Sequence, residues 1–106
     1  FLAFLDIMPL QKGHVLVIPK IEVDKIFDLD DDLLSSMMIF SKSVAEKIEK
    51  VFPCNRIGVA VIGLEVSHAH IHLIPINTIN DMNFANKKLV INQEELAEIA
   101  ERIRVQ

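Results

Sequence analysis

The sequence has few of the features that mark disulfide-linked, membrane-spanning or polyanion-binding proteins. A single cysteine, Cys54, cannot form an internal disulfide, which favours a reducing, cytoplasmic setting. No apolar run approaches the roughly 20 residues that a transmembrane helix needs, and we expect neither a leader peptide nor a membrane partner. The 11 Lys and Arg residues are scattered and are outnumbered by 15 acidic residues. This balance argues against a nucleic-acid partner, although a single nucleotide needs only a few local donors.

Two other features that carry chemistry in some proteins are interpreted here as structural. The acidic run at residues 28–32 has no glycine or closing glutamate at the spacing of a calcium-binding EF-hand loop. We interpret it as the first turn of a helix, where negative charge is favourable. Cys54 lies between Pro53 and Asn55 in an expected turn, with nothing nearby in the sequence to lower its pKa. A thiol nucleophile is therefore not expected.

The histidines are concentrated, because three of the four lie at alternate positions of one apolar run, residues 68–75 (HAHIHLIP). In a β-strand alternate side chains project from one face, so His68, His70 and His72 are expected to lie together. Alternate residues are roughly 6.6–7 Å apart along a strand, close enough for two or three rings to contact one bound group. Histidine is also the side chain that titrates nearest neutral pH. The pattern predicts a reactive face.

Three interpretations of this cluster are open from the residues alone. A purely structural cluster would need a hydrogen-bond partner for every polar ring. A metal site is a serious alternative, since His-x-His on a strand can chelate zinc and other transition metals. The third interpretation uses one histidine as a nucleophile and its neighbours as phosphate ligands.

The remaining pattern predicts a single α+β domain over residues 1–106, with an antiparallel sheet of about four strands and helices on one side. Apolar residues at helical spacing predict a long helix over residues 30–52, ended by Pro53. A short helix is expected within residues 22–29, and Asn92 is a predicted N-cap for a C-terminal helix. The predicted strands are residues 1–7, 14–19, 57–62 and 68–75.

Two segments resemble the histidine-triad (HIT) superfamily of nucleotide hydrolases and transferases. Residues 68–74 match the family pattern His-φ-His-φ-His-φ-φ, in which φ is apolar. Residues 3–9 (AFLDIMP) and 13–20 (GHVLVIPK) resemble the family's upstream strand-turn-strand motif. The resemblance covers the chain up to about Pro75 and implies a homodimer of α+β protomers that binds a purine nucleoside monophosphate.

The resemblance also implies roles for individual residues. His70 corresponds to the nucleophile that attacks the α-phosphorus and forms a nucleotidyl-histidine intermediate. His72 would contact the phosphate, and His68 would help to orient the site. Phe4 and Ile7 match positions that line the base pocket, and Asp6 matches the acidic residue that holds the ribose hydroxyls. No cofactor is implied.

The connection before the histidines, residues 63–67 (GLEVS), has its own expected contributions. Gly63 allows the backbone to approach a phosphate closely. Glu65 falls about where family members carry a hydroxyl residue that assists the leaving group, and Ser67 is a candidate substitute donor. His14 is expected to hydrogen-bond locally at a strand end, rather than to act at the site.

Two further departures from the family set expectations. Family members normally carry a helix, a strand and part of the base pocket before the point where this sequence begins, and we expect that segment to be missing here. Some bacterial relatives bind zinc through an N-terminal cysteine pair together with residues matching His14 and His68. That pair is absent, and two histidines are too few for a closed zinc site, so no metal is expected.

The sequence therefore predicts an enzyme that cleaves at the α-phosphate of purine nucleoside phosphoramidates or dinucleotides through a nucleotidyl-histidine. The alternatives are a nucleotide-binding module with weak or no turnover, and a metal-dependent histidine-cluster protein. Covalent modification of His70 distinguishes the first from the second, because binding alone leaves no adduct. Dimerisation is the expected use of any partner-binding surface on the long helix.

Overall fold

The computed structural model describes all 106 residues as one four-stranded antiparallel sheet, two α-helices and two short 3₁₀ helices. The strands are β1 (Leu2–Leu5), β2 (Val15–Ile18), β3 (Arg56–Ala60) and β4 (Ile71–Ile76). The helices are α1 (Asp31–Val51) and α2 (Gln93–Arg104), and the 3₁₀ turns are η1 (Ile26–Asp28) and η2 (Ile79–Met82). The predicted α+β architecture is confirmed.

The strand order is β1-β2-β4-β3, which places the two histidine-bearing segments side by side at the centre of the sheet. In this register His72 pairs with Leu16 on one side and with Ala60 on the other, and Phe4 pairs with Leu16. Residues directly opposite in an antiparallel ladder point to the same face. Phe4, Leu16, His72 and Ala60 therefore form one row across the sheet.

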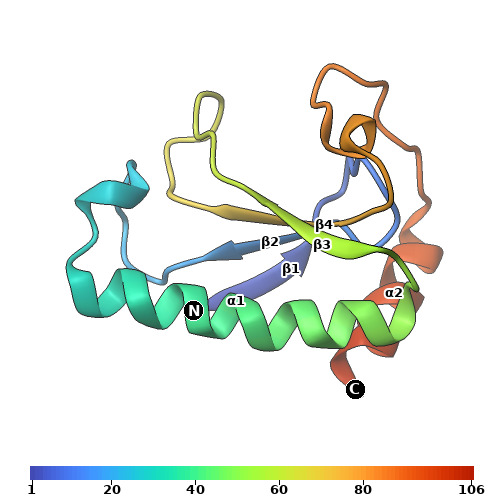
Figure 1. Ribbon diagram of the computed structural model, residues 1–106, viewed down its shortest axis with the longest axis horizontal. Helices are drawn as coiled ribbons and strands as arrows, with labels where there is room; N and C mark the ends of the chain where they lie inside the picture. Colours follow the sequence, from blue (N-terminus) through green and yellow to red (C-terminus); the bar gives the residue numbers. More distant parts are fainter.

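The opposite face of the sheet carries the core. Alternate residues of the two central strands, Val15, Val17, Ile71 and Leu73, are at most 3% exposed and pack with the buried face of α1. Figure 1 shows α1 running along this face, with the connecting loops rising on the other side. Because side chains alternate along each strand, burying this set turns His72 toward the loop-flanked face, called the open face below.

Helix α1 begins and ends where its sequence dictates. The Asp30 carboxylate caps it by accepting a hydrogen bond from the backbone N–H of Leu33 at 2.8 Å, and Asp31 and Asp32 add negative charge to the first turn. Pro53 follows the C-cap residue Phe52 and cannot continue the helix. Helix α2 is capped in the same way by Asn92, as predicted.

The turn between β1 and β2 depends on Gly13. Its φ is +91°, a left-handed value that favours glycine, and an added Cβ would lie 2.7 Å from a ring carbon of Phe52. A side chain cannot be accommodated there without moving the aromatic ring. Gly13 therefore allows the turn to pack against the end of α1 and delivers His14 to the start of β2.

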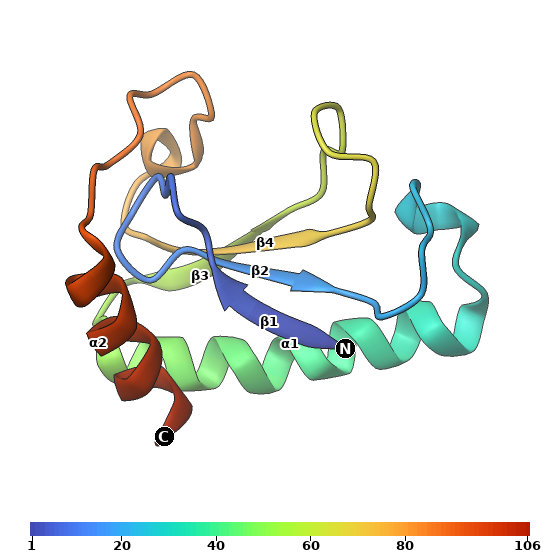
Figure 2. The ribbon, with the colours of Figure 1, turned by 180° about the vertical axis from the view of Figure 1, so that it is seen from behind.

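The C-terminal part of the chain contributes residues to both faces of the sheet. Helix α2 packs against α1 and β1, while η2 and the following loop cross one end of the open face, as the reverse view shows (Figure 2). Gly58 of β3 accommodates this crossing, because an added Cβ would meet the sulfur of Met82 at 2.7 Å. No helix combines the length and the apolar character required to cross a membrane.

Candidate functional site

The three clustered histidines do not all lie in a strand, contrary to the prediction. Strand β4 begins at Ile71, so His68 and His70 precede it and only His72 is paired in the sheet. On one side β3 ends at Ala60, the partner of His72, and on the other side the ladder with β2 ends at the Val17–Ile71 pair, so neither neighbour pairs with the earlier residues. Backbone and side-chain hydrogen bonds, rather than strand periodicity alone, therefore set the positions of the first two rings.

The orientation of His70 follows from one hydrogen bond. Its Nδ1 lies 2.8 Å from the backbone carbonyl oxygen of His68. A carbonyl can only accept, so His70 donates through Nδ1–H and, when neutral, leaves the lone pair of Nε2 free. The His70 and His72 ring centroids are 4.9 Å apart at an interplanar angle of 69°. A nucleophilic nitrogen is thus placed beside a second imidazole, at the centre of the sheet.

His68 is held at the edge of this arrangement. Its Nε2 lies 2.9 Å from the carbonyl oxygen of Pro19, just beyond β2, and therefore donates to it. The backbone N–H of Ala69 donates to the carbonyl of Val23 at 2.7 Å, which ties the same segment to the connection after β2. The His68 ring thus anchors the approach to β4, and its carbonyl orients the next histidine.

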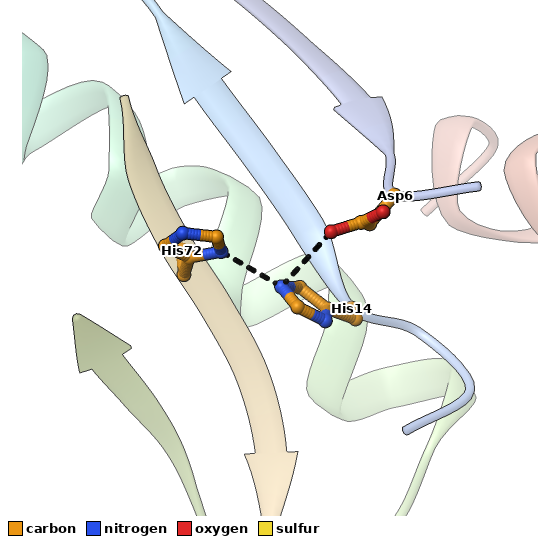
Figure 3. A group of neighbouring side chains, drawn as sticks. All are labelled: Asp6, His14 and His72. Carbon is orange, nitrogen blue, oxygen red and sulfur yellow. Dashed lines mark hydrogen bonds and ion pairs between the residues drawn. The ribbon is translucent and has the colours of Figure 1, made fainter. Parts of the chain in front are cut away.

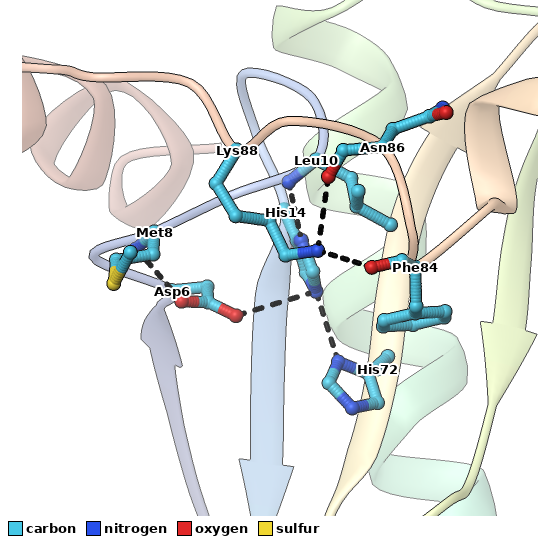
Figure 4. Close-up of polar contacts among 8 residues, drawn as sticks. All are labelled: Asp6, Met8, Leu10, His14, His72, Phe84, Asn86 and Lys88. Atoms are coloured by element: carbon cyan, nitrogen blue, oxygen red, sulfur yellow. Dashed lines mark hydrogen bonds and ion pairs between the residues drawn. The ribbon is translucent and has the colours of Figure 1, made fainter.

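His72 belongs to a chain of hydrogen bonds that begins at the backbone (Figures 3 and 4). The N–H of Leu10 donates to Nδ1 of His14 at 3.1 Å, so neutral His14 carries its proton on Nε2. That nitrogen lies 2.9 Å from Nδ1 of His72, which must then accept. His72 therefore carries its proton on Nε2. No fully buried side-chain nitrogen lacks a partner, so this unpaired N–H reaches accessible space.

Burial keeps this histidine pair neutral. Desolvation lowers the pKa of His14 to about 4, with the neighbouring positive forms of His72 and Lys88 acting in the same direction and Asp6 opposing them. Desolvation likewise lowers the pKa of His72 to about 4, assisted by His70. At pH 7 both rings are therefore uncharged, and each has one donor and one acceptor nitrogen. Their hydrogen bond fixes which nitrogen is which.

Asp6 closes the group from the end of β1 (Figure 3). One carboxylate oxygen accepts from the backbone N–H of Met8 at 2.9 Å, and the other lies 3.7 Å from Nε2 of His14. Asp6, His14 and His72 each present a ligand atom within 4.8 Å of the others, a spacing that can hold a metal ion. Nε2 of His14 carries the proton that it donates to Nδ1 of His72. A cation bound to both nitrogens would have to replace this proton.

The predicted substrate-binding residues occupy two places. Phe4 lies in the same cross-strand row as His72 and is 45% exposed, while Ile7, after β1, is 73% exposed. Glu65 and Ser67 are exposed in the loop between β3 and β4, where Gly63 has a φ of +73°. The backbone N–H groups of residues 63–67 donate to no other residue of the protein. These amides are available to an anionic ligand.

Cys54, expected to be unreactive, has an environment that opposes thiolate formation. Burial raises the pKa of its thiol, and the carboxylate of Glu49 raises it further. An activated cysteine requires the opposite change. The histidines are thus the nucleophilic side chains to consider.

Two neighbours of the site were not identified from sequence. The expected local bond of His14 exists, to Leu10, but its second nitrogen contacts His72 across 58 positions of sequence. Strand periodicity offered a signal, because His14 is in phase with Leu16 and out of phase with the core residues. Phe84, whose ring centroid is 4.8 Å from that of His72, lies in a loop and had no such signal.

Comparison with known proteins assigns the chain to a family. Residues 1–79 match the family model of the HIT domain. The adenosine 5′-monophosphoramidase of Saccharomyces cerevisiae is 39% identical over 75 residues, covering 69% of this chain and 47% of that protein. The asymmetrical bis(5′-nucleosyl)-tetraphosphatase of Schizosaccharomyces pombe is 35% identical over 78 residues, covering 69% and 43%. The chain spans about half the length of these curated relatives.

Solved structures extend the likeness to nearly the whole chain. The crystal structure of a HIT-like protein from Bartonella henselae, involved in cell-cycle regulation, has a TM-score of 0.81 and 30% identity. The match covers 97% of this chain and 77% of that protein. The 79 residues that match the family include all four strands and all four histidines. This chain therefore belongs to the HIT domain family.

Proposed function

We propose that this protein hydrolyses purine nucleoside phosphoramidates or dinucleotides at the α-phosphate, with His70 as the nucleophile. The observation that carries the proposal is the hydrogen bond from His70 Nδ1–H to the His68 carbonyl, which leaves the Nε2 lone pair free. The names of the matched relatives, a monophosphoramidase and a dinucleotide tetraphosphatase, support the substrate class.

The first step forms a bond between His70 Nε2 and the α-phosphorus. The bond from phosphorus to the leaving amine or phosphate breaks, and its electron pair departs with the leaving group, which takes up a proton. In the second step a water oxygen attacks the same phosphorus, loses a proton and releases the nucleoside monophosphate, while the pair of the N–P bond returns to His70. Splitting one displacement into two is the usual advantage of covalent catalysis.

His72 supplies a fixed donor for this chemistry. Its Nε2–H lies beside the nucleophile, and the hydrogen bond from His14 prevents the other tautomer. A donor that is already oriented stabilises charge developing on a phosphate oxygen without reorganising in the reaction. His68 acts as a positioning residue, through its carbonyl and its bond to Pro19.

The surrounding residues have roles that follow from their positions. Phe4 and Ile7 offer exposed apolar surface for a base, and the remaining lone pairs of Asp6 can accept hydrogen bonds from ribose hydroxyls. The unpaired amides beginning at Gly63 can contact the phosphate, and Ser67 can donate to the leaving group. Exposed Glu65 would repel a polyphosphate leaving group, so of the two proposed substrate classes it favours the phosphoramidates over the dinucleotides.

The test is the intact mass of the protein after rapid mixing with adenosine 5′-phosphoramidate. The wild type should gain one adenylyl group, and His70→Asn should gain none. Phe27→Ala, at an 87% exposed phenylalanine in η1 and outside the site, is the control and should be modified like the wild type. If His70→Asn were still modified, the assigned nucleophile would be wrong. Binding of AMP without any adduct in the wild type would instead favour a nucleotide-binding module.

The same family resemblance motivates a homodimer as the working form, and one surface supports it. An apolar groove between α1 and the edge strand β3 is lined by Met38, Ile39, Ala45, Ile57 and Val59, among others. Ile39 is 69% exposed and Val59 is 50% exposed. Ile39→Glu should dissociate a dimer in sedimentation experiments, whereas Val90→Glu, at a 95% exposed site outside the groove, should not. A wild type that sediments as a monomer would exclude this assembly.

A further inference from the structure

The segment that follows β4 contributes a wall to the histidine site. Residues 83–88 cross the open face beside His14 and His72, and they lie outside the 79 residues that match the family. The backbone N–H of Leu89 donates to the carbonyl of Pro9 at 2.8 Å, which ties the segment to the turn before His14. Within the segment, the Asn86 side-chain amide donates to the carbonyl of Asn80 at 2.8 Å.

Phe84 is the residue of this segment that touches the site. Its ring lies edge-on to His72, with centroids 4.8 Å apart and an interplanar angle of 68°. It is also 6.4 Å from the His14 ring, at 80°. Edge-to-face pairs at these distances are favourable and strongly directional. Phe84 therefore covers the hydrogen bond between the two imidazoles from one side.

Lys88 holds Phe84 in place (Figure 4). Its ammonium nitrogen donates to the backbone carbonyl of Phe84 at 2.5 Å and to that of Asn86 at 3.3 Å. The same nitrogen lies 5.8 Å from the centroid of the Phe84 ring, within the range of a cation–π interaction. One side chain thus fixes both the backbone and the ring of Phe84.

The charged and titratable groups around the pair come from every neighbouring element. Asp6 follows β1, His14 precedes β2, His70 directly precedes β4, and His72 lies within β4. Lys88 is the cation contributed by the C-terminal segment, and it disfavours a second positive charge on His14 or His72. Water admitted beside the pair would favour the protonated forms and weaken the preference for one tautomer.

We propose that Phe84, held by Lys88, is a positioning residue that shields the His14–His72 hydrogen bond from water and so keeps His72 a donor through Nε2. The consequence for catalysis rests on the function proposed above. The shielding itself does not, since it can be measured on the folded protein without any substrate. Phe84, which lies outside the residues that match the family, thus controls the tautomer of a histidine that lies within them.

The test follows the His14 and His72 ring signals of the full chain by NMR as a function of pH. In Phe84→Ala the pKa of His72 should rise by about one unit toward its ordinary value, as desolvation is relieved. The ¹⁵N shifts should change from a protonated Nε2 toward a mixture of tautomers. Phe84→Leu, which retains apolar cover, should restore most of the wild-type behaviour. Phe27→Ala, at an 87% exposed phenylalanine in η1, should change nothing.

If hydrolysis is detected, the acid limb of the pH profile of kcat should move to higher pH in Phe84→Ala, by the same amount as the pKa of His72. If the alanine variant does not fold, Phe84→Val takes its place, with a smaller shift expected in the same direction. Unchanged titration and unchanged tautomer in the folded variant would overturn the proposal. Absence of hydrolysis in the wild type, with the NMR changes present, would refute the proposed function while leaving the shielding role standing.

Discussion

Acid should destabilise this protein through its two buried imidazoles. His14 is 1% exposed and His72 is 8% exposed, and the pKa of each is lowered to about 4. In the unfolded chain each pKa returns to about 6.5. Between these values the unfolded chain binds more protons than the folded one, so the free energy of unfolding decreases as the pH falls from 6.5 to 4.

The size of the effect follows from the two pKa values. Lowering the pH from 7 to 5 removes about 2 kcal/mol of stability for one histidine whose pKa changes from 6.5 to 4. The two rings share a hydrogen bond and do not titrate independently, so their combined loss lies between about 2 and 4 kcal/mol. That is a large part of the stability of a typical domain, about 5–15 kcal/mol.

Urea unfolding at pH 7 and pH 5 measures this loss. The matched protein is the double variant His14→Gln/His72→Gln, in which the carboxylates still titrate but the two imidazoles do not. The wild type should lose at least about 2 kcal/mol more than the variant between the two pH values. Equal losses would show that burial of the two rings does not govern acid stability.

Three further predictions, two of them with a control substitution, test the local structure by urea unfolding. Gly13→Ala should lower the free energy of unfolding by more than about 2 kcal/mol, because it combines left-handed backbone strain with a Cβ 2.7 Å from a ring carbon of Phe52. Gly63→Ala has the same kind of strain but open space around its Cβ, and should lower it by about 1 kcal/mol. Asp30→Ala should cost about 1 kcal/mol by removing the cap of α1, and Asp32→Ala, which caps nothing, should cost clearly less. Ile71→Ala should cost about 2–5 kcal/mol, since its side chain is fully buried against α1; a loss below 1 kcal/mol would contradict the assigned core.

The sequence predicted elements whose signals are local. The helix over residues 30–52 was recognisable from its apolar period, its acidic first turn and Pro53, and α1 occupies residues 31–51. All four strands were predicted, but each predicted range is longer than the strand in the structure. β-Branched residues such as Val61 and Ile62 favour a strand even where no partner strand is present. Strand length is set by pairing, which is a tertiary property.

The site likewise combines features that have a local signal in the sequence with features that depend on tertiary structure. Period-two spacing correctly placed His70 and His72 close together, although only His72 lies in the strand. The contact between His14 and His72 depends on β2 and β4 being neighbours, which neither segment encodes by itself. Phe84 reaches the site from an irregular loop, where no periodicity constrains side-chain direction. Topology and loop conformation are what the residues alone could not supply.

The link between His14 and His72 makes the proton position on one ring a sensor of how the sheet is assembled. If β1 and β2 separated from β4, even briefly and without global unfolding, His72 would lose its partner and both of its tautomers would become populated. A single imidazole ¹⁵N signal would then report whether the N-terminal hairpin is docked. If heating undocks the hairpin while α1 is still folded, the ¹⁵N signal should change toward a mixture of tautomers before the helical signal is lost.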